Sequence, residues 1–322
     1  MARMIGVGGR NLAVECSGVA DGKPVFLMHG TPGGRGGPRP RDIVLYRLNI
    51  WLISYDRPGY GRSDRHRNRI VADAASDVAQ IADALGVERF SIVGRSGGGP
   101  HALACAALLR DRVERAAAMV SPAPPEAEGL DWFEGMTRSN VETYELADAD
   151  KMLAEAELRR RAADVRADPD QMMASLLPGL AGLDGRVIND ISLRRLVTDT
   201  IRDGLQESAD GWIDDVLALR SPWGCELSDI TASVLLWHGT EDRFSPVEHS
   251  RWLAGQIKDA TLLIEHGAAH FGAFEVLPEV LAWVTAPDET PATRQSAPAE
   301  MPVWDSIRTA EGRPRAAAAD SP

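Results

Sequence analysis

A serine in a glycine-rich turn has the surroundings of a reactive nucleophile. The segment FSIVGRSGGGP at residues 90–100 leads from a short β-branched run into the apolar residues 101–109. This pattern predicts a strand, a sharp turn and a helix. The turn forces its central residue, Ser96, into a cramped backbone conformation that the flanking glycines permit. Ser96 would then expose its hydroxyl above a sheet edge, where it could attack a carbonyl carbon, and the Gly97 amide would face the resulting oxyanion.

G-x-S-x-G alone also fits an ordinary glycine-rich turn, so this interpretation depends on partners for Ser96. A serine hydroxyl is a weak nucleophile until a neutral imidazole, itself oriented by a buried carboxylate, accepts its proton. Asp242 follows the apolar run 233–237, and His270 follows the run 260–264. If both runs are strands of one parallel sheet, the two side chains lie at the same edge as Ser96, in the chain order Ser, Asp, His.

Other residues compete for the two partner roles. His266 is the alternative base, but it lies where the last strand meets its loop. His270 lies further out on that loop and has more freedom to reach Ser96, so we favour it. Asp242 is favoured as the acid because it is best placed in its turn. The alternative acids are Glu241, Glu126 and Glu128. Two histidines that each precede a glycine at a strand end, His29 and His238, are interpreted as structural.

A second glycine-rich turn, HGTPGG at residues 29–34, also follows an apolar run. It lacks the phosphate-binding pattern G-x-x-x-x-G-K-[ST], so a nucleotide site is not favoured. An oxyanion loop fits better. Pro32 has no amide hydrogen, so the predicted donor from this turn is the Thr31 amide, paired with that of Gly97.

Strand and helix patterns alternate along the chain around these residues. Apolar runs predict strands at 24–28, 50–55, 90–93, 116–120, 233–237 and 260–264, and helical spacing covers 72–85, 101–109, 247–257 and 274–284. This alternation is typical of a parallel, doubly wound sheet. Residues 11–16 and 24–28 also predict a hairpin that leads into a central strand. Asp56, in the tight loop after the strand 50–55, is interpreted as a hydrogen-bond acceptor that ties the loop.

The pattern changes between residues 122 and 225, where only helical stretches such as 151–165 and 192–205 are found. We expect this helical insertion to lie over the carboxyl edge of the sheet, where such sheets bind ligands. The predicted domains are a first core part at 1–121, a helical cap at 122–225, a second core part at 226–286 and a flexible tail at 287–322. Large apolar residues of the insertion either pack it onto the core or line the ligand site. They are Trp132, Phe133, Met136, Met172, Met173, Leu176, Leu177, Trp212 and Trp223.

Composition argues against several other classes of protein. The 322 residues are 44% hydrophobic and 25% charged, which is ordinary for a globular protein with a sizeable core. A formal charge of −12 argues against a nucleic-acid surface. The 3 cysteines form no C-x-x-C pair, so neither a disulfide framework nor a zinc site is expected, and a reducing compartment fits. No apolar run has the length of a signal peptide or a membrane span, so we expect a cytoplasmic protein without membrane contact.

Together, the motifs resemble those of the α/β-hydrolase superfamily, in its capped esterase and peptidase-like branch. The segments that carry the resemblance are 29–34, 56–63, 94–100, 238–242 and 267–271. The resemblance implies an α/β-hydrolase fold, a mostly parallel doubly wound sheet with a helical cap inserted between strands 6 and 7. It also implies that the catalytic triad is Ser96, Asp242 and His270, and that the oxyanion hole is Thr31 and Gly97.

Two residues depart from the pattern of that superfamily. Ala269 stands where glycine is usual before the histidine, and it could shift the histidine loop slightly. Arg95 stands where an apolar or aromatic residue is usual. Its guanidinium could form a surface salt bridge or reach an acidic group of the substrate.

The resemblance implies a serine hydrolase that cleaves an ester, lactone, thioester or amide of a small, hydrophobic molecule through an acyl-enzyme on Ser96. Epoxide hydrolases and haloalkane dehalogenases of the same fold use aspartate at this position, so serine argues against both. The alternative is an acyltransferase, a carbon–carbon bond hydrolase, or a cyclase or lyase of the same fold. A non-catalytic ligand-binding module is less favoured, because it needs no complete triad. No cofactor or metal is expected, since no residue cluster has ligand spacing, and the sequence indicates no oligomeric state.

Overall fold

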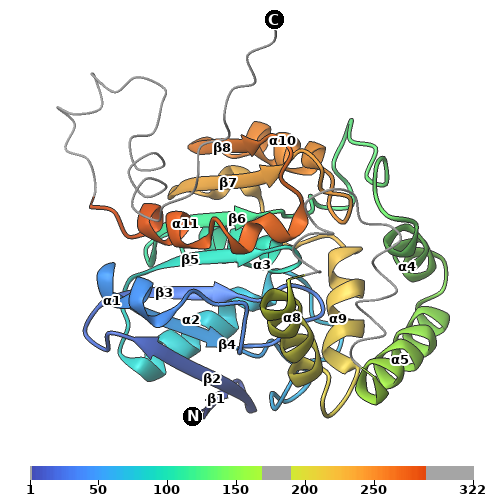
Figure 1. Cartoon of the computed structure of the whole chain (residues 1–322), viewed down its shortest axis with the longest axis horizontal. Coiled ribbons are helices and arrows are strands. Elements are labelled where there is room, and N and C mark those ends of the chain that lie inside the picture. The colour runs from blue at the N-terminus through green and yellow to red at the C-terminus, as the bar shows by residue number, and fades with distance from the viewer. Residues whose placement is uncertain (1, 169–189, 288–322) are drawn as a thin grey trace, which may run out of the picture.

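An eight-stranded sheet forms the centre of the protein in the computed structural model, which describes residues 2–168 and 190–287 (Figure 1). In chain order the strands are β1 (Arg3–Val7), β2 (Arg10–Gly18), β3 (Lys23–Met28), β4 (Ile50–Tyr55), β5 (Phe90–Arg95), β6 (Val113–Met119), β7 (Ser233–Gly239) and β8 (Ala260–Glu265). Their spatial order is β1-β2-β4-β3-β5-β6-β7-β8. The pairs β1–β2 and β2–β4 are antiparallel, and all pairs from β4 to β8 are parallel. The predicted, mostly parallel sheet is therefore confirmed.

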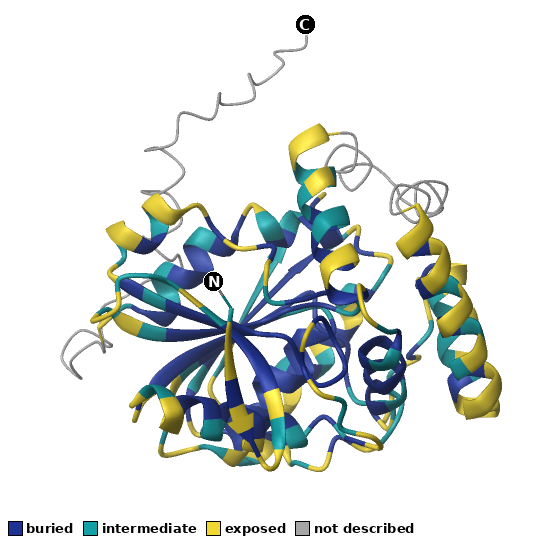
Figure 2. Cartoon of the chain, turned by 90° about the horizontal axis from the view of Figure 1, so that it is seen from below, coloured by how far each residue is buried: buried dark blue, intermediate teal, exposed yellow. Residues whose placement is uncertain are grey.

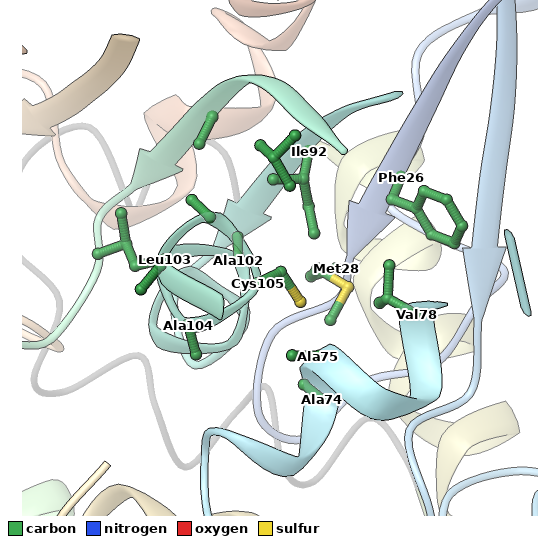
Figure 3. Close-up of a cluster of buried hydrophobic side chains, with 14 of the residues drawn as sticks. Phe26, Met28, Ala74, Ala75, Val78, Ile92, Ala102, Leu103, Ala104 and Cys105 are labelled. Carbon is green, nitrogen blue, oxygen red and sulfur yellow. The ribbon is translucent and has the colours of Figure 1, made fainter. Parts of the chain in front are cut away.

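Helices cover both faces of this sheet. One layer contains α2 (Asp73–Leu85), α3 (Gly98–Leu108) and α10 (Val247–Gln256), and the other contains α1 (Asp42–Arg47) and α11 (Leu277–Val284). Successive strand residues point to opposite faces. In β3, Phe26 and Met28 belong to the first layer, and Val25 and Leu27 belong to the second. Figure 3 shows the first layer, where Met28 faces side chains of α2 and α3.

Helix α2 shows how the sequence directs one such contact. Its buried residues include Ala74, Val78 and Ile81, which recur at helical spacing and form one apolar face. Gly86 ends the helix with a left-handed φ of 71°, a conformation that glycine adopts readily at helix ends. Figure 2 shows the same division across the molecule, with buried strands inside and the outward faces of many helices exposed.

A helical insertion separates β6 from β7, as the sequence predicts. Its described helices are α4 (Arg138–Ala149), α5 (Lys151–Ala167), α8 (Ile191–Gly204) and α9 (Asp210–Leu219), and the short 3-10 helix η2 (Leu227–Asp229) follows before β7. The predicted stretches 151–165 and 192–205 correspond to α5 and α8. An apolar cluster that includes Leu158, Ile201 and Ile213 joins α5, α8 and α9. In Figure 1 the four longer helices gather at one end of the sheet.

The predicted hairpin between residues 11–16 and 24–28 is wrong. Strand β2 pairs with β1 and β4, whereas β3 pairs with β4 and β5, so β4 lies between them. The connecting loop crosses the start of β4, where the Val19 amide donates to the Ile50 carbonyl (2.8 Å) and the Lys23 amide donates to the Asn49 carbonyl (2.7 Å). The chain thus passes over a strand that comes later in the sequence.

Some sequence predictions fall on other parts of the chain. Of the predicted tail at 287–322, residues 288–322 lie outside the described residues. The same is true of Met172, Met173, Leu176 and Leu177 in the predicted insertion. Among the described helices, none combines the length and apolar character that crossing a membrane requires.

Candidate active site

Ser96 lies in the sharp turn between β5 and α3. Its φ of 53° is in the left-handed region, which costs a non-glycine residue roughly 1–3 kcal/mol. The surrounding backbone holds this conformation, because the Ser96 amide donates to the Met119 carbonyl (2.9 Å) and the Ser96 carbonyl accepts from the Gly99 amide (2.8 Å). A Cβ at Gly94 would lie 2.3 Å from the Gly98 carbonyl oxygen, so the turn needs glycine there. The predicted strand, turn and helix around the serine are thus present.

His270 and Asp242 form a hydrogen-bonded chain with Ser96. His270 begins the short 3-10 helix η3 (His270–Phe274) after β8, and Asp242 lies in the turn after β7. The His270 Nε2 lies 3.1 Å from the Ser96 Oγ, and the His270 Nδ1 lies 2.8 Å from the Asp242 Oδ2. His270 is 5% exposed and Asp242 is 4% exposed, so both are shielded from water. The structure brings together the residues that the sequence predicts for nucleophile, base and acid.

Asp242 is held as an ionised carboxylate. Its Oδ1 accepts hydrogen bonds from the amides of Phe244 (2.8 Å) and Ser245 (3.1 Å), and the His238 Nε2 lies 3.2 Å from its Oδ2. Burial raises the pKa of the Asp242 carboxyl, but His270 and His238 outweigh burial and hold this pKa below its usual range. A carboxylate only accepts hydrogen bonds, so His270 carries its proton on Nδ1 and leaves the Nε2 lone pair for the serine hydroxyl.

The alternative base and acids are not part of this chain of hydrogen bonds. All of them are exposed at the surface, and the structure does not bring them to Ser96: they are His266, Glu241, Glu126 and Glu128. His238 is fully buried, and its Nδ1 lies 2.6 Å from the Ser250 Oγ. His238 therefore helps to hold the Asp242 carboxylate in place, in agreement with a structural role.

The Thr31 and Gly97 amides lie next to Ser96. A Cβ at Gly97 would lie 2.3 Å from the Thr31 Oγ1 and 3.4 Å from the Thr31 amide nitrogen. The Thr31 side chain therefore packs this closely against residue 97 only because that residue is glycine. Within the described part of the chain, neither amide has a hydrogen-bond acceptor. Two such N–H groups beside a nucleophile can stabilise an oxyanion.

A cavity of about 440 Å³ has Ser96 and His270 in its wall, together with Thr31 and Gly97. This volume is in the range of pockets for small molecules. The wall is mainly apolar around these residues and polar along α4 and α5. The apolar side chains include Trp132, Met136, Trp212, Val216, Phe244 and Phe271, and the polar ones include Ser139, Asn140, Thr143 and Arg161.

Some of the large apolar residues predicted in the insertion line the cavity, and others pack against neighbouring side chains. Trp132, Met136 and Trp212 line the cavity. Trp223 packs in the main core, and the Phe133 ring packs against Trp132 at 5.3 Å between ring centroids. Both interpretations of these residues, as packing and as lining, therefore hold for some of them.

A family model described as the alpha/beta hydrolase fold matches residues 23–276, which is most of the chain. The chain belongs to the alpha/beta hydrolase fold family. It is 27% identical over 267 residues to the 2-hydroxymuconate semialdehyde hydrolase of Pseudomonas putida, covering 79% of this chain and 83% of that protein. A shorter match, 35% identical over 102 residues, is to the proline iminopeptidase of Xanthomonas citri and covers 30% of this chain and 31% of that protein.

A solved structure shows the same fold. The enol-lactonase of Burkholderia xenovorans LB400 superposes with a TM-score of 0.63 at 18% sequence identity. The superposition covers 88% of this chain and 98% of that chain. At this identity the likeness concerns the alpha/beta hydrolase fold and not the reaction.

Two departures from the α/β-hydrolase pattern have a local explanation. Ala269 has a φ of −130° and a ψ of −168°, an extended conformation that any residue adopts, so glycine is not required before His270. Arg95 lines the cavity, and its guanidinium lies 4.4 Å from the centroid of the Phe274 ring. Arg95 is thus placed in the cavity wall, where a cation could face an acidic group of a ligand.

Other loop residues of this alpha/beta hydrolase have supporting contacts. Asp56 accepts hydrogen bonds from the amides of Arg35 (2.8 Å) and Arg62 (3.3 Å), which agrees with a loop-tying role. No sequence motif singles out Phe244, whose ring centroid lies 4.9 Å from that of His270. The position of Phe244, two residues after Asp242, is the sequence signal that could have indicated its place beside His270. Among residues 2–168 and 190–287, no group of 3 or more histidine, cysteine or carboxylate side chains could hold a metal ion.

Proposed function

We propose that this alpha/beta hydrolase is a serine hydrolase that cleaves an ester, lactone, thioester or amide of a small, largely apolar molecule. The observation that carries the proposal is the chain of contacts from the Ser96 Oγ to His270 (3.1 Å) and from His270 to Asp242 (2.8 Å), at the wall of the cavity. A hydroxyl in this arrangement can lose its proton to the imidazole as it attacks. Neither group needs a metal ion or an organic cofactor for this step.

The proposed reaction has two halves. In the first, the Ser96 Oγ attacks the acyl carbon, the His270 Nε2 accepts the hydroxyl proton, and the amides of Thr31 and Gly97 bind the oxyanion. His270 then gives that proton to the leaving group, and the bond to the leaving group breaks. In the second half, a water molecule loses a proton to His270 and attacks the acyl-enzyme, which releases the acid and restores the Ser96 hydroxyl.

We further propose that the insertion at 122–225 acts as a cap over the core formed by residues 1–121 and 226–286. Its side chains supply much of the cavity wall, including Trp132, Met136 and Trp212. An apolar wall favours an apolar acyl or alcohol portion next to the reacting bond, because burying that portion removes it from water. The polar residues along α4 and α5 would suit a polar group at the far end of the substrate.

Carbon–carbon bond hydrolysis is a second candidate. The relative that matches over 79% of this chain is named 2-hydroxymuconate semialdehyde hydrolase, and carbon–carbon hydrolases occur among the matched proteins. The same serine, histidine and oxyanion site could serve such a reaction. Product analysis distinguishes the candidates, since an ester yields an acid and an alcohol, whereas carbon–carbon cleavage of a diketone yields an acid and a ketone.

The test is hydrolysis of p-nitrophenyl esters of increasing acyl length by the wild type and by Ser96→Ala. We expect turnover by the wild type, a loss of several orders of magnitude in the variant, and a chain-length preference that reflects the cavity. Equal turnover by the two proteins would contradict the role of Ser96. If neither protein hydrolyses any ester, the same pair is assayed with an enol diketone for carbon–carbon cleavage.

A further inference from the structure

We infer that Asp215 of α9 and Arg57 of the loop after β4 position the oxyanion hole, and thereby couple the inserted helices to catalysis. Neither residue lines the cavity, so both act through Thr31 and are positioning residues. The inference rests on the proposed function, because it assigns a role to the Thr31 amide. A cluster of buried charged side chains, those of Asp215, Arg57 and Arg69, lies next to Thr31.

Asp215 lies at the centre of the cluster and is fully buried. Its side chain is 0% exposed, and those of Arg57 and Arg69 are 1% and 3% exposed. Its Oδ1 accepts hydrogen bonds from the Arg57 Nε (3.2 Å) and from Arg69 (2.6 Å), and its Oδ2 accepts from Arg57 and from the Tyr60 hydroxyl (2.9 Å). Burial raises the pKa of Asp215, but Arg57 and Arg69 outweigh burial and hold this pKa well below its usual range. Charges buried this deeply cost desolvation free energy, so the cluster calls for a role beyond general stability.

The cluster holds the side chain of Thr31. The Thr31 hydroxyl donates to the Asp215 Oδ2 at 2.5 Å and accepts from Arg57 at 3.2 Å. Because α9 belongs to the insertion and Thr31 to the core, this contact joins the two parts directly at the proposed oxyanion donor. A hydroxyl fixed from both sides leaves Thr31 few alternative positions.

The cluster also acts on the peptide group that contains the Thr31 amide. That N–H shares its peptide group with the Gly30 carbonyl, which accepts hydrogen bonds from Arg57 (3.1 Å) and from the His29 Nδ1 (2.8 Å). The His29 Nε2 accepts from the Arg57 amide (3.2 Å), so His29 carries its proton on Nδ1. A cationic donor at the carbonyl oxygen polarises the peptide group and makes its N–H a stronger donor. Arg57 therefore both places and strengthens the proposed oxyanion donor.

The net charge of the cluster also favours binding of an oxyanion. Two guanidinium groups, those of Arg57 and Arg69, share one carboxylate, that of Asp215. His29 and His101 remain neutral, since burial lowers the pKa of both, that of His101 to about 3. A positive charge thus lies behind the position where negative charge would develop, in a region that excludes water.

The chain contains a matched control on the same helix. Asp214, the neighbour of Asp215, accepts two hydrogen bonds from Arg65, from Nε (2.8 Å) and from a terminal nitrogen (2.8 Å). The Asp214 side chain is only 4% exposed, so this pair also joins α9 to the core in a buried position. Its contacts do not include Thr31 or Gly30. Losing it should therefore weaken the attachment of α9 and leave the oxyanion hole intact.

The experiment compares Asp215→Asn with Asp214→Asn, and adds Thr31→Val, which keeps the amide but removes the hydroxyl. The measurements are kcat and KM for the best p-nitrophenyl ester, the melting temperature, and inhibition by a trifluoromethyl ketone of matching chain length, which forms a tetrahedral adduct with a serine. We expect Asp215→Asn and Thr31→Val to lower kcat roughly 10- to 100-fold at nearly constant KM, and to weaken the inhibitor similarly. The Asp214→Asn variant should keep its kcat and inhibitor affinity, even where its melting temperature falls. The double variant of Thr31 and Asp215 should have a kcat only a little below that of either single variant, since both substitutions break the same hydrogen bond.

Several results would overturn the inference. One is an unchanged kcat in Asp215→Asn, and another is an equal loss of kcat in the Asp214 and Asp215 variants, which would indicate general attachment of α9. If Asp215→Asn does not fold, Thr31→Val decides the matter, because full kcat in that variant excludes the coupling. If the wild type hydrolyses no ester and does not react with a fluorophosphonate, the proposed function fails and this inference fails with it. A wild type that reacts normally beside unaffected variants refutes the inference alone.

Discussion

The chain of contacts from Ser96 contains an ionised carboxylate, that of Asp242, and one tautomer of an imidazole, that of His270. The low pKa of Asp242 follows from His270 and His238, which outweigh the effect of burial. The ionised carboxylate then requires a proton on the Nδ1 of His270, and the Nε2 lone pair faces the serine hydroxyl at 3.1 Å. A general base needs this tautomer to accept the proton as the oxygen attacks.

Asp242→Asn should therefore remove most of the activity without removing the side chain. The amide group can stabilise the wrong tautomer of His270 and cannot stabilise the imidazolium, so we expect kcat to fall by about 10⁴-fold. Initial rates on the best ester measure this loss. Glu241→Gln, at the exposed neighbouring position, serves as the control and should retain its rate. A loss below tenfold in Asp242→Asn would contradict the assignment of the acid.

Two elements meet at the proposed oxyanion hole, the loop after β3 and the start of α3. Their approach depends on the missing side chain at Gly97, where a Cβ would lie 2.3 Å from the Thr31 Oγ1. The sequence could predict both elements, since a strand, a glycine-rich turn and a helix are local patterns. It could not predict that β4 lies between β2 and β3, because pairing with a later strand leaves no local signal.

Gly97→Ala should displace Thr31 and separate the two amides. Because each oxyanion donor contributes roughly a hundredfold or more to kcat, we expect a loss of at least that size with a smaller change in KM. Gly36→Ala is the control, since a Cβ at Gly36 would meet no atom within 4 Å. Comparable kcat values for the two variants would show that the close contact at Gly97 has no bearing on the reaction.

The whole molecule is an alpha/beta hydrolase sheet whose proposed site is completed by a helical insertion. The sequence could indicate Ser96, Asp242 and His270, because each follows a predicted strand at the same edge. It could not indicate Asp215, whose partners Arg57 and Thr31 lie 158 and 184 positions away along the chain. Such a contact between the insertion and the core exists only once both parts are folded.

This contact should give the stability of the molecule a defined pH dependence. The pKa of Asp215 is lowered in the folded state from its usual 3.8, so the unfolded chain binds the proton first as the pH falls. Its contribution to the free energy of unfolding is therefore fully present above about pH 5 and declines as the pH falls below 3.8. Urea unfolding of the wild type and Asp215→Asn should show a difference at pH 7 that narrows at pH 3.5. A difference that does not change with pH would contradict an ionised Asp215.

The most direct test of the central claim is the site of covalent labelling by a fluorophosphonate. The compound reacts with a serine hydroxyl that a neighbouring base activates, and the intact mass of the protein then rises by one phosphonyl group. We predict a single label on the peptide that contains Ser96, no label in Ser96→Ala, and a much slower reaction in His270→Ala. A label on another residue, or an unlabelled wild type, would contradict the account.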